Sequence, residues 1–118
     1  MTRDQQRAKI AYQNVLGIAA GTEALQDDYR TLVRGLGANI MRSGLSATIS
    51  YIERYRNSAA SEALLGHLSA ANIPHLAPNL DVGQTVRGLG LDDYMLVTRE
   101  VLMFTVWLRR AVQGLLGD

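Results

Sequence analysis

Apolar residues recur every three or four positions along most of the chain, which is the spacing of one face of an α-helix. The pattern predicts helices over residues 2–20, 22–34, 38–56, 57–71 and 92–116, and one or two helical turns over 81–87. Alternation of apolar and polar positions, the mark of a half-buried strand, is almost absent. We therefore expect a single all-α domain over residues 1–118, a compact bundle of about five helices plus a short helical turn, with a long C-terminal helix.

Polar residues at the starts of these segments support the predicted boundaries. Thr2 and Gln5 have the spacing of a capping box, in which each side chain bonds a backbone amide of the other residue. The expected N-caps are Thr2, Thr22, Asn57, Asp81 and Asp92. The tetrapeptide Arg-Gly-Leu-Gly occurs at 34–37 and again at 87–90, each time after a helical segment. Glycine is common just past helix ends, so we interpret both copies as helix stops in preference to phosphate-binding loops.

The predicted helices carry apolar stripes that would meet in one core. The expected inward positions are Ala8, Tyr12, Val15 and Ala19; Leu25, Tyr29, Leu32, Val33 and Leu36; Met41, Leu45, Ile52 and Tyr55; Ala60, Leu64, Leu68 and Ala71; and Tyr94, Val97, Val101, Phe104, Leu108, Ala111, Val112 and Leu115. The helix over 38–56 has a second apolar face with Ile40, Ala47 and Tyr51, which predicts burial on two sides.

The last predicted helix is also apolar on its outward side, where an ordinary surface helix is polar. That side carries Met95, Arg99, Leu102, Met103, Val106 and Arg110, with Trp107 on its flank. Such a helix is either central in its own bundle or covered by another chain. Methionine, tryptophan and arginine are enriched in protein interfaces, which favours a protein-binding surface at these positions.

Composition narrows the chemistry that this bundle can perform. The chain is 47% hydrophobic and 19% charged, which is typical of a folded domain, and its formal charge is only +1. Without cysteine it has no disulfides, thiolate nucleophiles or sulfur-ligated zinc. Eleven of the twelve basic residues are arginine. This excess reflects either a GC-rich genome or a use of the planar guanidinium in phosphate and interface contacts.

Neither a secretory signal nor a membrane segment is expected. The first twenty residues carry several charges and no apolar core of a signal peptide. The most apolar run, residues 101–108, is far too short to span a bilayer. Absence of cysteine is compatible with a reducing cytosol, so we expect a cytoplasmic protein without a membrane partner.

A search for catalytic motifs is nearly empty. His67 and His75 have the spacing of neither helical metal ligands nor a zinc finger, and we interpret His67 as a partly buried core histidine. The pair Asp27–Asp28 is explained by pairing with Arg30 and by solvent exposure, and the pair Asp92–Asp93 by helix capping. We expect no enzymatic activity and no metal or other cofactor.

A further pattern runs through the chain as an ordered set of residues. Its members are Tyr29, Leu32, Arg34, Leu36, Ile40, Gly44, Leu45, Ile49 and Tyr51; Tyr94, Thr98, Arg99, Glu100 and residues 107–111; and Arg7, Ala8 and Tyr12. This set resembles the small helical subunit of type III-B CRISPR effector (Cmr) complexes, over nearly the whole chain. The resemblance implies an all-α subunit without catalytic activity of its own. It also implies that several copies stack beside the subunits holding the CRISPR RNA and line the groove where target RNA pairs with it.

In such a subunit, arginines on one face would meet RNA phosphates, while guide–target pairing supplies the sequence specificity. The RNA-binding candidates are Arg34, Arg42, Arg56, Lys9 and Arg54, and a wider set adds Arg3, Arg7, Arg30, Arg99, Arg109 and Arg110. Arg42 and Arg56 are expected on the same side of one helix. The expected partners are the other subunits of the effector complex, neighbouring copies of the chain, and target RNA paired with CRISPR RNA. A helical protein–protein adaptor with no direct RNA contact is the alternative.

Overall fold

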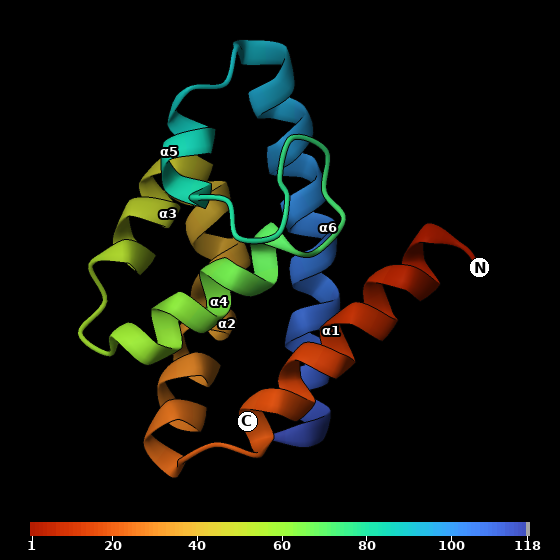
Figure 1. The fold of residues 1–118 in the computed structure, drawn as a ribbon, viewed down its shortest axis with the longest axis vertical. Helices are drawn as coiled ribbons and strands as arrows, with labels where there is room; N and C mark the ends of the chain where they lie inside the picture. Colours follow the sequence, from red (N-terminus) through yellow and green to blue (C-terminus); the bar gives the residue numbers. More distant parts are fainter. Residues whose placement is uncertain (118) are drawn as a thin grey trace.

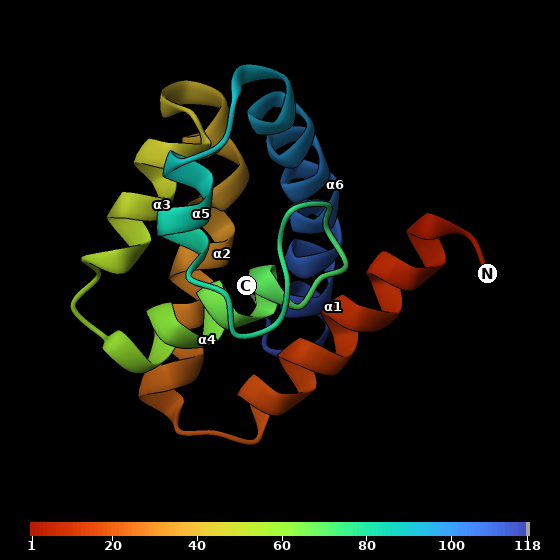
Figure 2. The same cartoon turned by 45° about the horizontal axis from the view of Figure 1, so that its top comes forward.

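The computed structural model describes residues 1–117, which form six α-helices and no strand. The helices are α1 (Arg3–Ala19), α2 (Glu23–Ser43), α3 (Leu45–Glu53), α4 (Ser58–Ser69), α5 (Val82–Arg87) and α6 (Leu91–Leu115). α6 packs along α1 and α2, and α2 also contacts α3 and α4 (Figure 1, Figure 2). The domain measures 38 × 37 × 26 Å, and Figure 1 looks down its shortest axis. The expected all-α bundle with a long C-terminal helix is confirmed.

Local capping explains most helix starts. The backbone amide of Gln5 donates to the Thr2 hydroxyl at 3.1 Å, and the backbone amide of Thr2 donates to the side-chain oxygen of Gln5 at 2.8 Å. The two bonds complete the capping box. Side chains also cap α2, α4 and α5 as expected, at Thr22, Asn57 and Asp81. The prediction for α6 is wrong. That helix begins after Gly90, and Asp92 lies inside its first turn, where the positive end of the helix dipole favours its charge.

The break after the second helix lies at Gly44 and not at residues 35–37. α2 continues through the first Arg-Gly-Leu-Gly segment because Leu32, Leu36 and Ile40 form one buried stripe. Packing of that stripe outweighs the weak helix propensity of the two glycines. Gly44 has a φ of +90°, a conformation that residues with a side chain rarely adopt, and this ends the helix.

The displaced break also changes the third helix. α3 ends at Glu53, so Arg56 lies in the following loop, whereas Arg42 belongs to the last turn of α2. The expectation that these two arginines share one side of one helix is therefore wrong. The second Arg-Gly-Leu-Gly copy does end a helix as predicted, because α5 stops at Arg87.

One core joins the helices, and its largest fully buried side chains are Tyr29 and Phe104. Several residues expected in the core lie at the surface instead: Tyr12 (39% exposed), Met41 (76%), Tyr51 (47%), Leu115 (37%) and Ala47. Each lies beside the buried stripe of its helix, so periodicity alone did not separate it from the core. Within residues 1–117, none of the helices is long and apolar enough to cross a membrane.

Candidate partner-binding surfaces

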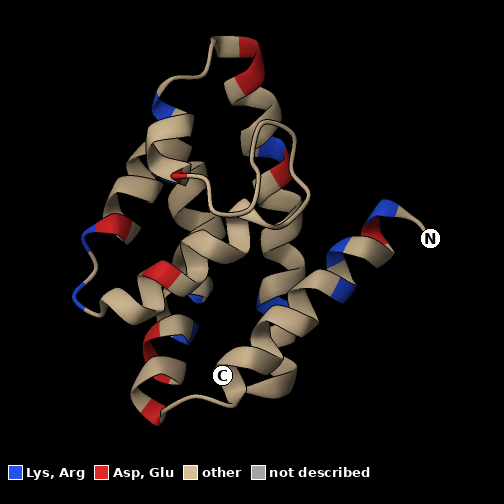
Figure 3. Cartoon of the chain, in the orientation of Figure 1, with Lys and Arg blue, Asp and Glu red and all other residues tan. Residues whose placement is uncertain are grey.

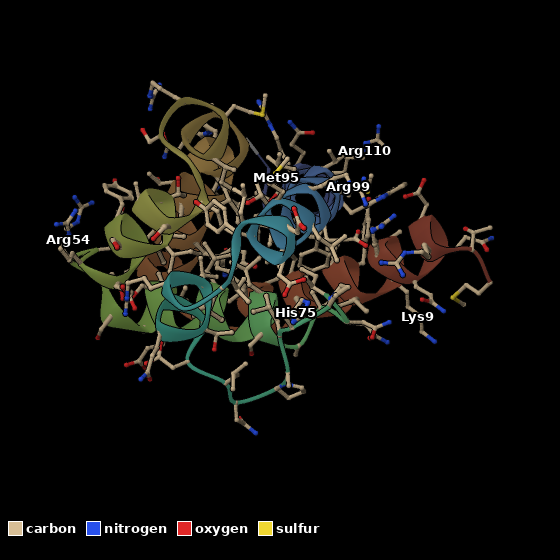
Figure 4. All side chains as sticks on the ribbon, turned by 90° about the horizontal axis from the view of Figure 1, so that it is seen from above. Lys9, Arg54, His75, Met95, Arg99 and Arg110 are labelled. Atoms are coloured by element: carbon tan, nitrogen blue, oxygen red, sulfur yellow. The ribbon has the colours of Figure 1, made fainter. Side chains whose placement is uncertain are left out.

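The outward side of α6 keeps apolar and basic residues exposed. Helical spacing places the predicted protein-binding residues together there: Met95, Arg99, Leu102, Met103, Val106 and Arg110. Figure 4 shows Met95, Arg99 and Arg110 on the side of α6 away from His75. The Arg110 guanidinium lies 4.7 Å from the centre of the Trp107 ring, a cation–π contact that orients it. These residues are available to a partner, although their protein-binding role stays a prediction.

A groove separates this side of α6 from α2, and we call it the α2–α6 groove. It has a volume of about 280 Å³ and is lined by Val33, Arg34, Gly37, Met41, Leu102, Thr105, Val106 and Arg109. Arg34, predicted to bind RNA, therefore lies beside Leu102 and Val106, which are predicted to bind protein. No acidic residue of the described chain is among the groove's lining residues.

A second arginine-bearing surface, which we call the α3 edge, comprises Arg42, Tyr51, Arg54, Tyr55 and Arg56. Arg42 and Tyr51 line a pocket of about 370 Å³ where α2 meets α3. The Arg56 guanidinium lies 5.4 Å from the centre of the Tyr55 ring and 3.3 Å from Asp28. Arg42 and Arg54 have no acidic partner among residues 1–117. Two exposed guanidinium groups of the α3 edge are thus free of competing carboxylates.

The predicted RNA-binding residues do not form one patch. Lys9 on α1 and Arg54 after α3 lie at opposite ends of the molecule (Figure 4). Arg34 lies in the α2–α6 groove, apart from the α3 edge. Figure 3 likewise shows the basic residues divided among separate regions of the fold. Arg42 at the end of α2, Arg54 at the C-cap of α3 and Arg56 in the following loop are the largest group of these candidates on one surface.

Two arginines of the wider candidate set are used inside the fold. Arg3 and Arg7 donate to the two carboxylate oxygens of Glu100 at 2.5 and 2.7 Å. The Arg7 and Glu100 side chains are only 14% and 10% exposed, so the pair joins α1 to α6 where an unpaired charge is strongly destabilising. Arg30 similarly donates to the Leu116 and Gly117 carbonyls. These arginines are held by the protein itself, which argues against their use on RNA.

The histidines also serve the fold. The Tyr29 hydroxyl and His67 Nδ1 lie 2.8 Å apart, and burial lowers the pKa of His67 to about 4. The interpretation of His67 as a partly buried, hydrogen-bonded residue is confirmed. At the surface, His75 Nε2 lies 3.2 Å from a carboxylate oxygen of Asp93. Nowhere in residues 1–117 do three His, Asp or Glu side chains group closely enough to hold a metal ion.

Asp28 is half-buried and not solvent-exposed as expected. It accepts hydrogen bonds from the Asn57 side-chain amide at 2.8 Å and from the Tyr55 hydroxyl at 3.1 Å. These bonds, that from Asn57 foremost, hold the pKa of Asp28 below its usual value. Asp28 thereby ties the α3–α4 loop to α2 and orients the neighbouring Arg56. Sequence reasoning missed it because its partners lie on a later loop that periodicity does not place.

Comparison with known proteins identifies the family. The family described as CRISPR-associated protein (Cas_Cmr5) matches residues 3–115. The chain belongs to the Cmr5 family. It is 29% identical over 117 residues to the "CRISPR system Cmr subunit Cmr5" of Thermus thermophilus, covering 99% of this chain and 98% of that protein. The crystal structure of a CRISPR-associated Cmr5 family protein from Thermus thermophilus superposes with a TM-score of 0.83, at 27% identity over 98% of this chain and 97% of that one.

Membership in the Cmr5 family confirms the resemblance noted in the sequence. Many residues of the ordered set belong to the core, namely Tyr29, Leu32, Leu36, Ile40, Leu45 and Ile49. They explain the shared fold but say nothing about partners. Arg34, Tyr51 and Arg99 of the same set are exposed, so core packing does not account for them.

Proposed function

We propose that the chain is a non-catalytic subunit of a type III-B CRISPR effector complex. In this proposal several copies stack, and their arginines contact target RNA paired with CRISPR RNA. The observation that carries the proposal is a family match over residues 3–115 in a chain with exposed arginines that no acid within residues 1–117 neutralises. The relative from Thermus thermophilus is named as a subunit of a Cmr system, which supports a place in a larger assembly.

The α3 edge is the proposed RNA contact. Arginine binds backbone phosphates through several hydrogen bonds without reading the bases. Base pairing supplies specificity in RNA-guided complexes, so such a subunit needs no base-reading groups. We assign Arg42 and Arg54 to this contact and add Arg56 as a weaker member, because its side chain is 81% exposed but its guanidinium pairs with Asp28 at 3.3 Å. Lys9 is kept as a separate phosphate candidate on α1. Arg34 is reassigned to protein contacts because it shares the α2–α6 groove with apolar residues.

The outward side of α6 is the proposed contact with protein subunits. Met95 and Val106 are 61% and 49% exposed there, and burial of such side chains is a main source of interface stability. Met103→Glu would bury a carboxylate in that interface, so we expect it to abolish co-purification with the complex. Gln13→Glu on α1 makes the same charge change away from this surface and should co-purify normally. Retention of the Met103→Glu chain would show that this side of α6 is not an interface.

Salt dependence of RNA capture by the assembled complex tests the RNA contact. Each lost phosphate contact lowers the slope of log affinity against log salt concentration by roughly 0.7–0.9. We expect the triple variant Arg42→Ala, Arg54→Ala and Arg56→Ala to bind RNA more weakly and to lower the slope by about two. Arg87→Ala is the control, since it removes an arginine already paired with Glu53 at 3.1 Å. An unchanged slope in the triple variant would leave the protein–protein adaptor as the better function.

The isolated chain should bind RNA poorly. Its formal charge of +1 provides little long-range attraction to a polyanion. Phosphate contacts therefore become effective only when the assembly holds the RNA against the α3 edge. Filter binding of the purified chain and of the complex to the same RNA measures this difference, and equal affinities would contradict it.

A further inference from the structure

A second groove opens between α4, the loop before α5 and the end of α3, and we call it the acidic groove. Its volume is about 490 Å³, and its lining includes Glu53, Glu62, Leu65, Leu80 and Asp81. None of the described residues that line it is basic. Figure 3 shows acidic residues of α4 and of the segment before α5 on this face. The acidic groove thus combines apolar surface with carboxylates.

These carboxylates are only partly used by the fold. One Asp81 oxygen accepts from the Gln84 amide at 3.0 Å to cap α5, and Glu53 pairs with Arg87 at 3.1 Å. Glu62 is exposed and has no basic partner within residues 1–117. The groove therefore keeps negative charge available for a partner that carries cations.

The α2–α6 groove has the opposite character. It exposes Met41 and Val106 between Arg34 and Arg109, without an acid among its lining residues in the described chain. The elements that form the two grooves lie on opposite faces of the molecule. In Figure 1, α4 and the loop before α5, which form the acidic groove, lie in front of α2 and α6. In Figure 4 the outward side of α6, which borders the α2–α6 groove, faces away from that loop. One chain therefore presents two apolar grooves of complementary charge that face away from each other.

We infer that the acidic groove of one copy binds the α2–α6 groove of the next copy. This inference rests on the proposed stacking of copies and specifies the surfaces that make the contact. A second copy is the occupant that the charges favour, because both halves of the complementary pair are on this chain. Like grooves would bring like charges together, which disfavours face-to-face dimers.

The geometry also defines the form of the stack. Contact between two different surfaces on opposite faces is head-to-tail and continues from copy to copy without closing on itself. The stack would run along the shortest axis of the domain, whose extent is 26 Å. Arg54 of the α3 edge lies at the side of the molecule, between these two faces (Figure 4), so a stack of this form would leave it uncovered in every copy.

The contact should be weak between isolated chains. Exposed ion pairs contribute little each and are screened by salt. Copies held side by side by other subunits bind at a high effective concentration, which makes the same contact effective in the complex. A covalent trap is therefore the right assay for the purified chain.

Cysteine cross-linking provides that trap, because the chain contains no cysteine of its own. Met41→Cys places a thiol in the α2–α6 groove and Ala70→Cys places one in the acidic groove. We expect a chain with both changes to form a ladder of oligomers with a short bismaleimide at low salt. Mixing the two single-cysteine chains should give about tenfold more dimer than either alone, since only unlike grooves attract.

Charge reversal then identifies the surfaces. Added to the double-cysteine chain, Glu62→Arg or Arg109→Glu should each abolish the ladder, and the two together should restore it. Glu23→Arg is the control, because Glu23 is exposed and lines neither groove, and it should leave the ladder intact. Circular dichroism verifies that each variant is folded.

Two results would overturn the inference. The first is a ladder of oligomers that is unchanged by Glu62→Arg and by Arg109→Glu. The second is that each single-cysteine chain alone forms as much cross-linked dimer as the mixture of the two. Either result would show that the two grooves do not bind each other between copies. The assay uses the purified chain without RNA, so its failure leaves the salt-slope test of the proposed RNA contact unaffected.

Discussion

The inner and outer sides of α6 use charged residues for opposite purposes. On the inner side, Glu100 is held by Arg3 and Arg7 in a largely buried junction with α1. Arg99, the residue before it, is exposed on the outer side together with Arg110. The difference teaches that burial and pairing decide which arginines are available to partners. The formal charge of +1 for the whole chain does not show the local positive charge on the outer side of α6.

Arg7→Met should produce the largest loss of stability at neutral pH, because it deprives Glu100 of one of its two cations. Removing one partner of a buried ion pair typically lowers the free energy of unfolding by about 3–5 kcal/mol, and since Arg3 remains we expect about 2–3 kcal/mol here. Urea unfolding followed by circular dichroism measures it. Arg110→Met makes the same change on the outer side and should lower the free energy of unfolding by less than about 1 kcal/mol. Equal losses in the two variants would abolish the distinction between the sides.

The pH dependence of stability should follow the buried histidine. Burial holds the folded-state pKa of His67 at about 4, below the ordinary value of 6.5. Between these values the unfolded chain binds a proton that the folded chain does not. The contribution of His67 to the free energy of unfolding is therefore fully present above pH 6.5. It falls as the pH drops toward 4, by up to about 1.4 kcal/mol per pH unit.

Unfolding free energies measured at several pH values test this titration. His67→Gln should remove this part of the decline, whereas the surface variant His75→Gln should keep it. If the free energy of unfolding falls in parallel with pH in the wild type and in His67→Gln, burial does not lower the pKa of His67 in the folded chain.

Gly37 inside α2 and Gly44 at its C-terminal end should respond to substitution in opposite directions. Gly44→Ala forces a side chain into a φ of +90° and should lower the free energy of unfolding by about 1–2 kcal/mol. Gly37→Ala should raise it by about 0.5 kcal/mol, because alanine favours the helix interior. Its methyl group would lie 3.7 Å from the Thr105 methyl, an ordinary contact at the border between the two sides of α6. Thermal unfolding of both variants measures the signs, and destabilisation by Gly37→Ala would show that the helices are too close there.

How far the fold is predictable from sequence depends on the range of the interaction. The caps Thr2, Thr22 and Asn57 were predictable because each bonds an amide three residues away. The helix break was not, since packing of the buried stripe carries α2 past Gly37 to Gly44. Glycine content alone does not reveal whether tertiary contacts will hold a helix together.

The candidate surfaces show the same limit. Residues on the outward side of α6 were predictable because one long helix fixes their directions by periodicity. Arg42 and Arg56 were misplaced relative to each other because the break between their elements was misplaced. The ion pair that holds Arg7, an RNA-binding candidate, against Glu100 was not predictable, since the two residues are 93 positions apart in the chain.

A structure of the assembled complex with target RNA tests the central claim most directly, that arginines of the α3 edge meet RNA while those of α6 meet protein. The measurement is the distance from each guanidinium group to the nearest phosphate oxygen. We predict a phosphate oxygen within about 3.5 Å of Arg42 or Arg54, with the outward side of α6 covered by protein. RNA lying along the outward side of α6, with the α3 edge away from it, would contradict the account.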